Sequence, residues 1–420
     1  MEKINNNNSY KMIIWTLLTI FYVYQYVLRI LPDVFANFFI ENWNVSGDKL
    51  GQIFGIYYIG YAIMHIPFGI WADTGKIKTI VSLTIIGIIA SLFMMNIAHN
   101  NWMILLFSRF LLGACSAAAW TILIKTSASN FKRFSLAISM SAFIGHMLSG
   151  YSNNPLYTYY KNNSWEEMNY LLIYMAAILL ILCFLFMPNK LFKSNKVDEG
   201  GTETNNIGEE NSKQKTSKLK TIIKNKEYIL YCILGGLMVG IIEGFVGGWA
   251  NKLFHQAYSS IITEKQISTL LPFLLAGFAF GTPLISMICE VTKKDFLVLI
   301  FAASIMLVSF SLVLSGMLNS YIQIAIAATA MGTASGYQCS IMALAIRKMP
   351  QEISGLASAI VNMIIMTAGY IFHTIIGLMM GDAKLIDLQR ALSIIPIGLL
   401  LAIFLGIYLH INDKRSKASV

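Results

Sequence analysis

The sequence predicts an all-α membrane protein with twelve transmembrane helices arranged as two pseudo-symmetric six-helix bundles. Composition is the first reason: 56% of the 420 residues are hydrophobic and only 12% are charged, whereas soluble domains carry about 25% charged residues. The second reason is a succession of apolar stretches that reach the length of about 20 residues needed to cross a bilayer. The third is a polar insert that divides these stretches six and six.

The predicted spans follow one another with short connections in each half. The first six are expected at 12–38, 50–71, 77–99, 102–125, 134–153 and 168–188. The second six are expected at 228–253, 266–289, 295–317, 320–346, 354–380 and 389–411. The first stretch lacks a small-residue cleavage pattern, so we expect a retained helix rather than a signal peptide.

Three domains follow from this division of the chain. We expect an N-terminal six-helix bundle at 1–188 and a C-terminal bundle at 227–420, joined by a linker at 189–226. The linker is rich in Asn, Lys, Glu, Gly, Ser and Thr and lacks apolar periodicity. Such a segment cannot bury enough apolar surface to fold alone, so we predict a flexible cytoplasmic connection.

Basic residues are distributed unevenly between the two predicted membrane faces. Most of the 31 Lys and Arg residues fall in the segments that lie on the same side as the N-terminus. The segments on the other side hold only Lys49, Lys161, Lys252, Lys265, Lys384 and Arg390. Because cytoplasmic loops carry the Lys and Arg excess, both termini are predicted to be cytoplasmic. The net charge of +10 therefore reflects membrane topology rather than a nucleic-acid partner.

Several other classes of chemistry are not expected. All five cysteines fall within apolar spans, where they act as packing residues rather than disulfide partners. The sequence has no metal-ligand spacing, no phosphate-binding Gly-Lys-Ser/Thr loop and no paired catalytic constellation. We therefore expect no metal, no cofactor, no ATP-driven transport and no enzyme activity.

The first predicted helix carries a polar stripe on an otherwise apolar sequence. Tyr22, Gln25, Tyr26, Arg29 and Asp33 recur every three or four residues, so they share one helix face. Lipid would not tolerate this face, and a fixed guanidinium in a cavity is a natural ligand for a carboxylate or phosphate. We predict that Tyr22, Gln25, Tyr26 and Arg29 bind the substrate. The alternative is an internal salt bridge from Arg29 to Asp33.

Glu243 is the only acidic residue in the interior of the seventh predicted helix. This helix corresponds to the first helix in the other half, so Glu243 is placed to face Arg29 across a central cavity. A buried carboxylate whose proton affinity depends on a neighbouring cation offers a route to proton coupling. The alternative for Glu243 is a structural hydrogen bond.

Other polar and aromatic residues within the spans complete the predicted site. His146 and His373 lie in corresponding helices and are candidates for proton relay, with ordinary hydrogen bonding as the alternative. Further substrate-binding candidates in the cavity are Trp120, Gln338, Asn362 and Tyr370.

The two halves also share a sequence pattern at the end of their second helix. The first half has Gly60-Tyr61-Ala62, then Pro67 and Asp73, and the second has Gly277-Phe278-Ala279, then Pro283 and Glu290. In both, an acidic residue lies thirteen positions after the glycine. The recurrence indicates a duplicated unit, which is the usual architecture of secondary transporters with a substrate site between the repeats.

The loop that follows this pattern resembles a family signature. Gly69, Asp73, Gly75, Lys76 and Lys78 resemble the loop 2–3 motif of the major facilitator superfamily, although Thr74 replaces a common basic residue. The resemblance implies that Asp73, Gly75 and Lys76 form a gate, with Asp73 at the start of helix 11. Glu290 is expected to do the same at helix 5. The alternative is a short turn kept soluble by its charges.

Two further resemblances bear on function. The pair Arg109 and Gly113 resembles the helix 4 pattern of the superfamily, which implies proton coupling by Arg109; snorkelling to the membrane surface is the alternative. The segment from Tyr22 to Arg29 resembles helix 1 of the organic anion and organophosphate symporters of the superfamily. The longer stretch from Phe21 to Pro32, together with Tyr57 to Pro67, looks like transporters of intracellular bacteria that include the phagosomal amino-acid transporters.

Together these patterns predict a secondary active transporter of a small polar or anionic solute, with an amino acid or carboxylate favoured. We expect proton symport by alternating access, in a monomer embedded in the lipids of a bacterial inner membrane. An uncoupled exchanger or uniporter of small metabolites and a non-transporting receptor with the same fold remain the alternatives.

Overall fold

The computed structural model describes residues 8–43, 45–72, 76–98, 101–131, 134–189, 221–222, 224–350, 353–380 and 385–418. Across these ranges the chain forms α-helices joined by short turns, and they contain no β-strand. The predicted linker lies almost entirely outside the described residues, so its flexibility stays a prediction.

The described part of the first half contains seven helices. They are α2 (Asn8–Val34), α3 (Ala36–Trp43), α4 (Gly47–Ala72), α5 (Ile77–Ala98), α6 (Trp102–Asn130), α7 (Phe134–Asn162) and α8 (Trp165–Phe186). Within this half α4 packs on α6, α5 packs on α6 and α8, and α2 packs on α7.

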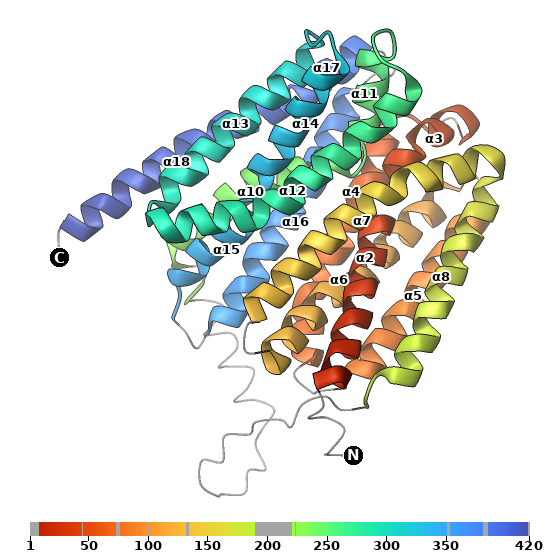
Figure 1. Ribbon diagram of the computed structural model, residues 1–420, viewed down its shortest axis with the longest axis horizontal. Helices are drawn as coiled ribbons and strands as arrows, with labels where there is room; N and C mark the ends of the chain where they lie inside the picture. Colours follow the sequence, from red (N-terminus) through yellow and green to blue (C-terminus); the bar gives the residue numbers. More distant parts are fainter. Residues whose placement is uncertain are drawn as a thin grey trace, which may run out of the picture.

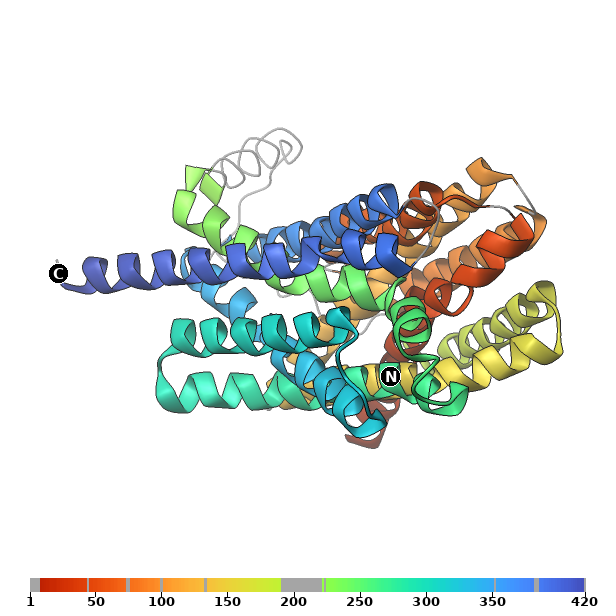
Figure 2. The ribbon, with the colours of Figure 1, turned by 90° about the horizontal axis from the view of Figure 1, so that it is seen from above.

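The second half repeats this arrangement. Its helices are α10 (Lys226–Val246), α11 (Ala250–Tyr258), α12 (Glu264–Thr292), α13 (Asp295–Ser315), α14 (Tyr321–Ser335), α15 (Gln338–Arg347), α16 (Ser354–Met379), α17 (Leu385–Leu392) and α18 (Ile394–Ala418). Here α12 packs on α14, α13 packs on α14 and α18, and α10 packs on α16. The two halves lie side by side (Figures 1 and 2).

Ten helices in the described ranges are long and apolar enough to cross a membrane. Two of the twelve predicted spans fall short of these criteria. The span predicted at 134–153 lies within α7, which has a polar sequence, and the span predicted at 320–346 is divided into α14 and α15 at Gly336 and Tyr337. The all-α membrane fold is therefore confirmed, while the count of twelve spans is not exactly confirmed, since ten helices of the described residues meet both criteria.

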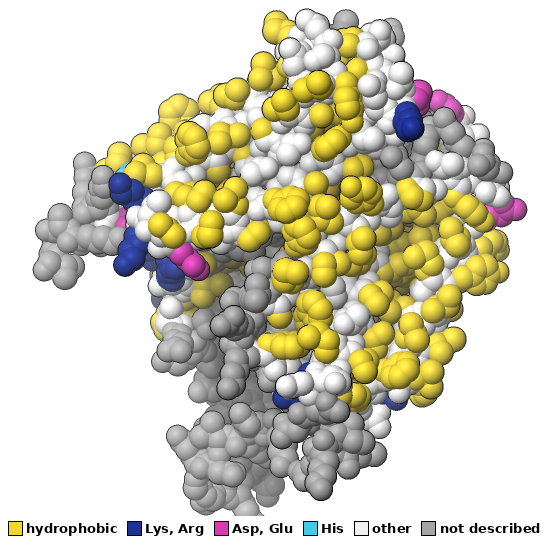
Figure 3. Space-filling view, in the orientation of Figure 1, with side chains coloured by type: hydrophobic (Ala, Val, Ile, Leu, Met, Phe, Trp, Pro, Cys, Tyr) yellow, Lys and Arg dark blue, Asp and Glu magenta, His cyan; other side chains and the backbone are white. Residues whose placement is uncertain are grey.

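The outer surface of the molecule fits a lipid environment. Large apolar side chains cover the face seen in Figure 3, and charged side chains gather near its edges. Phe301 is 68% exposed and Phe404 is 67% exposed, although both are large hydrocarbons. Exposed apolar surface of this extent is expected where the solvent is the hydrocarbon of a bilayer rather than water.

Glycines allow the central helices of each half to approach closely. A Cβ atom at Gly60 would overlap the carbonyl oxygen of Phe110, so α4 and α6 meet backbone to backbone. At the corresponding position of the second half, a Cβ atom at Gly277 would overlap the carbonyl oxygen of Thr329 on α14. The sequence repeat around these two glycines therefore corresponds to the same helix contact in each half.

Replacing either contact glycine with alanine should destabilise the fold. We expect Gly60→Ala and Gly277→Ala each to reduce the free energy of unfolding by about 1–3 kcal/mol, because the added methyl group forces two helices apart. A thermal melt of the purified protein would show this as a lower melting temperature. Gly69→Ala is the control, since a Cβ atom there meets nothing within 4 Å. Equal melting temperatures for all three variants would contradict the close-packing argument.

The two halves meet most closely at the end opposite to the chain termini, here called the far end. There the backbone of α4 at Gly51 lies against α16 at Gly377, with 2.9 Å from a Cβ built at Gly51 to the Cα of Gly377. Gly150 of α7 lies similarly close to Leu275 of α12. Toward the other end, here called the terminal end, α15 and α18 diverge from α6 and α7 (Figure 1).

Candidate functional site

An ion pair joins the two halves near the centre of the molecule. Arg29 of α2 donates from Nη1 to both carboxylate oxygens of Glu243 on α10, each at 3.1 Å. Both side chains are almost fully buried, at 4% and 5% exposure. The arginine thus finds its partner in the opposite half, and the side chain of Asp33, the alternative partner, lies outside the described residues.

Four tyrosine rings surround the Arg29 guanidinium. The Arg29 Cζ atom lies 4.8 Å from the ring centroid of Tyr26, 4.9 Å from Tyr61, 5.6 Å from Tyr58 and 5.8 Å from Tyr57. The negative faces of aromatic rings attract a cation, most strongly where water is excluded. This cage stabilises the guanidinium in the protein interior, beside the carboxylate of Glu243.

Tyr58 positions the acidic partner. Its hydroxyl group donates to Oε2 of Glu243 at 3.2 Å and lies 3.0 Å from the backbone carbonyl oxygen of the same residue. The carboxylate therefore receives hydrogen bonds from an arginine and a tyrosine of the first half. Buried charges are stable only when they are paired and hydrogen-bonded in this way.

A cavity of about 50 Å³ lies beside the ion pair. Both halves line it, through Tyr22, Tyr26, Arg29, Tyr61, Trp120, Ala142, His146, Glu243, Thr282, Gln338, Met342, Asn362 and Met366. A water molecule takes up about 30 Å³ in the liquid, so the cavity in this conformation is smaller than an organic solute. Side chains must move, or the ion pair must open, before a solute can bind here.

Most of the residues predicted to bind the substrate or couple protons lie around this cavity. Tyr22 and Trp120 form one wall, with ring centroids 5.0 Å apart. His146 lies next to Tyr26, with ring centroids 4.7 Å apart, and its Nδ1 atom lies 2.6 Å from the carbonyl oxygen of Ala142. The second half contributes Gln338 and Asn362 together with Glu243.

Three other predicted residues lie away from the cavity lining. Gln25 is fully buried and accepts a hydrogen bond from the Tyr57 hydroxyl at 3.0 Å, which ties α2 to α4. Tyr370 is partly buried and packs against Gly55. His373 is fully buried, with its ring centroid 5.3 Å from that of Tyr58. Gln25 and Tyr370 thus support the interior helix contacts, and His373 lies behind the ion pair.

Arg109 lies inside the first half rather than at the membrane surface. It is fully buried, and it donates from Nε to the carbonyl oxygen of Ile53 at 3.3 Å and from Nη1 to that of Leu28 at 3.2 Å. Its guanidinium also lies 5.0 Å from the Tyr57 ring centroid. The snorkelling alternative is therefore wrong. Arg109 connects α6 to α2 and α4, and its part in proton coupling stays a prediction.

The predicted gate is described only in part. Asp73 and Gly75 lie outside the described residues, while Lys76 is exposed immediately before α5. Glu290 is exposed near the end of α12. Their gating roles remain predictions.

The structure adds three residues of α4 that the sequence reasoning did not assign to the site. Tyr58 and Tyr61 contact the ion pair, and His65 links the halves: its Nε2 atom lies 2.7 Å from Nδ2 of Asn362. The Nδ1 atom of His65 lies 3.1 Å from the Thr121 hydroxyl. Residues 58, 61 and 65 have the three- and four-residue spacing of a helix face. The spacing that marks the polar face of the first predicted helix is thus present in the sequence of α4 as well.

With this geometry in place, comparison with known proteins identifies the family. The family model of the Major Facilitator Superfamily matches residues 12–374. The chain belongs to this superfamily, and it is a transporter protein rather than an enzyme. No curated protein matches its sequence closely.

Two solved structures share the fold over nearly the whole chain. A bacterial homologue of the human lysosomal transporter Spinster, in an inward-facing and unoccupied conformation, has a TM-score of 0.68 at 15% identity and covers 96% of this chain and 98% of its own. A single-residue mutant of the nucleoside transporter NupG has a TM-score of 0.74 at 12% identity and covers 94% and 99%. At 12–15% sequence identity these similarities show a shared fold and no more than that.

Proposed function

We propose that this protein is a secondary active transporter that carries small organic carboxylates, amino acids foremost, together with protons. The observation that carries the proposal is the buried pair of Arg29 and Glu243 between the two halves, beside a cavity lined by both. A site at the interface of two pseudo-symmetric bundles is reached from one side of the membrane and then from the other as the bundles rock.

The charges of the pair support an anionic solute. A carboxylate that enters the cavity competes with Glu243 for the guanidinium of Arg29, which offers the planar fork that carboxylates bind. The aromatic walls around Tyr22 and Trp120 provide apolar contact for the rest of a small solute. A neutral solute has no charge with which to replace Glu243 at the arginine. It would bind beside the intact ion pair and gain no charged contact with Arg29.

The same competition supports proton coupling. When a solute takes Arg29, Glu243 is left buried without its cation, and a buried carboxylate in that position is stabilised by binding a proton. Loading would thus require one proton for each solute carboxylate. His146 borders the same cavity and is a second group able to hold a proton on the path.

Charge balance also defines the uncoupled alternative. An amino acid carries an ammonium group that can pair with Glu243 while its carboxylate pairs with Arg29. If both contacts form at once, the pair is replaced without a proton, and the protein would act as a uniporter or exchanger. Whether protons move with the solute therefore separates the two mechanisms.

The proposed orientation follows from the charge distribution. The start of α2, the end of α18 and the basic residues Lys293, Lys294, Arg347 and Lys348 all lie at the terminal end. The Lys and Arg excess favours the cytoplasm for this end. With that orientation, the described conformation is closed toward the outside and diverges toward the cytoplasm. We propose the bacterial inner membrane as the location, with the protein working as a monomer among its lipids.

Transport by the purified protein in liposomes tests these proposals. Labelled amino acids, monocarboxylates, dicarboxylates, nucleosides and neutral sugars would be offered, while a trapped dye reports the internal pH. We expect uptake of at least one carboxylate solute with acidification of the vesicle interior. Uptake restricted to nucleosides or sugars would overturn the carboxylate proposal. Carboxylate uptake without acidification would overturn proton coupling and favour the uniporter or exchanger.

A further inference from the structure

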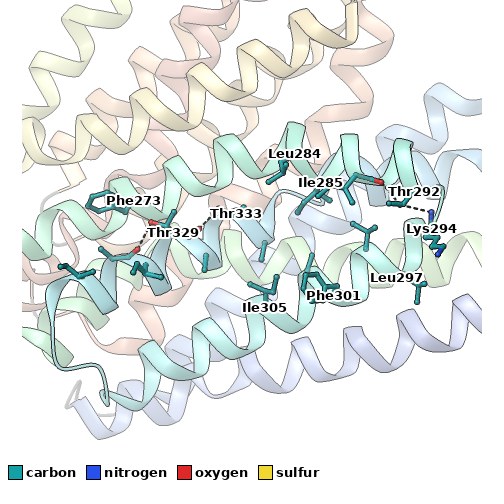
Figure 4. Close-up of a pocket in the computed structure, with 18 of the residues that line it drawn as sticks. Phe273, Leu284, Ile285, Thr292, Lys294, Leu297, Phe301, Ile305, Thr329 and Thr333 are labelled. Atoms are coloured by element: carbon teal, nitrogen blue, oxygen red, sulfur yellow. Dashed lines mark hydrogen bonds between the residues drawn. The ribbon is translucent and has the colours of Figure 1, made fainter.

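An apolar groove on the outer surface of the second half is separate from the central cavity. It lies along α12 and α13, with α14 between them, and has a volume of about 960 Å³ (Figure 4). Leu284 and Ile288 line it from α12, and Leu297 and Phe301 line it from α13. It shares no lining residue with the cavity beside Arg29.

The three threonine hydroxyl groups that line the groove are each bonded within their own helix. Thr329 donates to the carbonyl oxygen of Ala325 at 2.8 Å, and Thr333 donates to that of Thr329 at 2.9 Å. Thr292 donates to the carbonyl oxygen of Ile288 at 2.7 Å. These carbonyl bonds occupy the hydroxyl protons, so the groove suits an apolar chain better than a polar solute.

A cation stands at the terminal end of this groove. Lys294 is exposed at the junction of α12 and α13, where Figure 4 shows it beside Thr292. Among the described residues, no carboxylate forms an ion pair with its ammonium group. The adjacent Asp295 is occupied by Arg347, at 3.1 Å, and Glu290 lies exposed on the preceding turn. The ammonium is thus available to an anion at the membrane surface.

On α12 the groove extends from Thr292 to Phe273, nineteen residues or about 28 Å, and the part of it nearest Lys294 matches one leaflet. From Thr292 to Leu284, α12 advances eight residues, or about 12 Å at the helical rise of 1.5 Å per residue. Half of a hydrocarbon core of about 30 Å is about 15 Å. A chain lying along this stretch therefore begins at the height of the Lys294 ammonium and ends near the middle of the membrane.

We propose that this groove binds an anionic phospholipid from the leaflet at the terminal end. Its phosphate head group contacts Lys294, and one acyl chain lies between α12 and α13 along Ile288, Leu297 and Phe301. The charge of the lysine selects anionic over zwitterionic head groups, because basic residues near a membrane surface attract anionic lipids. The apolar walls hold the chain.

Native mass spectrometry of the full chain tests the head-group contact. The probes are dioleoyl-phosphatidylglycerol and the zwitterionic dioleoyl-phosphatidylcholine. We expect the wild type to bind phosphatidylglycerol more tightly, and Lys294→Gln to weaken that binding about five-fold, the effect of one lysine near the surface. Lys293→Gln is the matched control, since Lys293 does not line the groove. Equal losses in the two variants, or none in either, would refute a specific head-group site.

A second pair of variants tests the acyl-chain contact. Val298 lines the groove on α13, whereas Val308 of the same helix is 58% exposed and lies outside it. Val298→Phe should narrow the groove and reduce the retention of both lipids. Val308→Phe should leave lipid retention at the wild-type level. Equal retention by these two variants would overturn the groove as the binding site. Neither result depends on whether the protein carries carboxylates or protons.

Discussion

Replacing Arg29 with glutamine is expected to reduce uptake of a carboxylate solute at least 10- to 100-fold. A hydrogen bond to a charged group contributes about 1.5–3 kcal/mol, and each 1.4 kcal/mol is about a factor of ten in affinity. Glutamine keeps much of the volume but offers no guanidinium fork. Initial uptake rates of the variant in liposomes, over a range of solute concentrations, measure the loss.

The same substitution should also lower stability, which has to be separated from the loss of binding. Without Arg29 the carboxylate of Glu243 is buried and lacks its cation, at a cost of about 3–5 kcal/mol. The double variant Arg29→Gln with Glu243→Gln removes both charges. Its melting temperature should therefore return most of the way from the value of Arg29→Gln to that of the wild type. The double variant should not recover uptake, since neither amide restores the charge that binds the solute.

Arg347→Gln is the matched control for the removal of an arginine. Its ion pair with Asp295 lies at the surface, and the Arg347 side chain is 67% exposed. Exposed pairs contribute only about 0–1 kcal/mol, so both melting temperature and uptake should stay near wild type. Wild-type uptake by a folded Arg29→Gln protein would remove the arginine from the site and, with it, the reason to favour carboxylates.

The sequence predicted the helical architecture because lipid imposes simple rules. Apolar stretches of sufficient length and a skewed distribution of basic residues are readable without knowledge of tertiary contacts. The breaks within predicted spans were not readable. The chain leaves α10 at Gly247 and resumes as α11 at Ala250, and α14 ends near Gly336. A hydropathy window averages over such turns.

The central contact was accessible from sequence because a buried charge requires a partner. Arg29 and Glu243 occupy the interiors of corresponding helices, so the repeat made their proximity a reasonable hypothesis, and they lie 3.1 Å apart. The partners of Arg109 carry no such signal. They are the backbone carbonyl oxygens of Leu28 and Ile53, which any sequence would supply, and only the packing of α6 against α2 and α4 selects them.

Replacing Glu243 with glutamine should separate solute binding from proton movement. With its oxygen at the Oε2 position the amide still accepts hydrogen bonds from Arg29 and from the Tyr58 hydroxyl. Arg29 loses its carboxylate, so the free energy of unfolding should fall by about 3–5 kcal/mol, and transport is measured at a temperature at which the variant is folded. The amide cannot gain or lose a proton in the transport cycle. We therefore expect solute exchange between the two sides of a liposome membrane to continue at a rate within about ten-fold of wild type. Accumulation driven by a pH gradient should be lost.

Two measurements on the same vesicles distinguish the outcomes. Counterflow of labelled solute, with no pH gradient, reports binding and the movement between conformations. Concentrative uptake under an inward proton gradient reports coupling. Glu264→Gln is the matched control, because the Glu264 side chain is 69% exposed at the start of α12 and lies away from the cavity. It should retain both activities.

The decisive comparison is between the two activities of Glu243→Gln. If gradient-driven accumulation persists while counterflow is normal, the proton is carried elsewhere, and His146 becomes the first candidate because it borders the same cavity. If both activities fail in a folded protein, Glu243 is needed for the conformational cycle itself. Its ion pair with Arg29 joins the two halves in the described conformation. Glu243 has the coupling role only if counterflow is normal and gradient-driven accumulation is lost. In that case the variant still carries the solute across the membrane but no longer carries the proton with it.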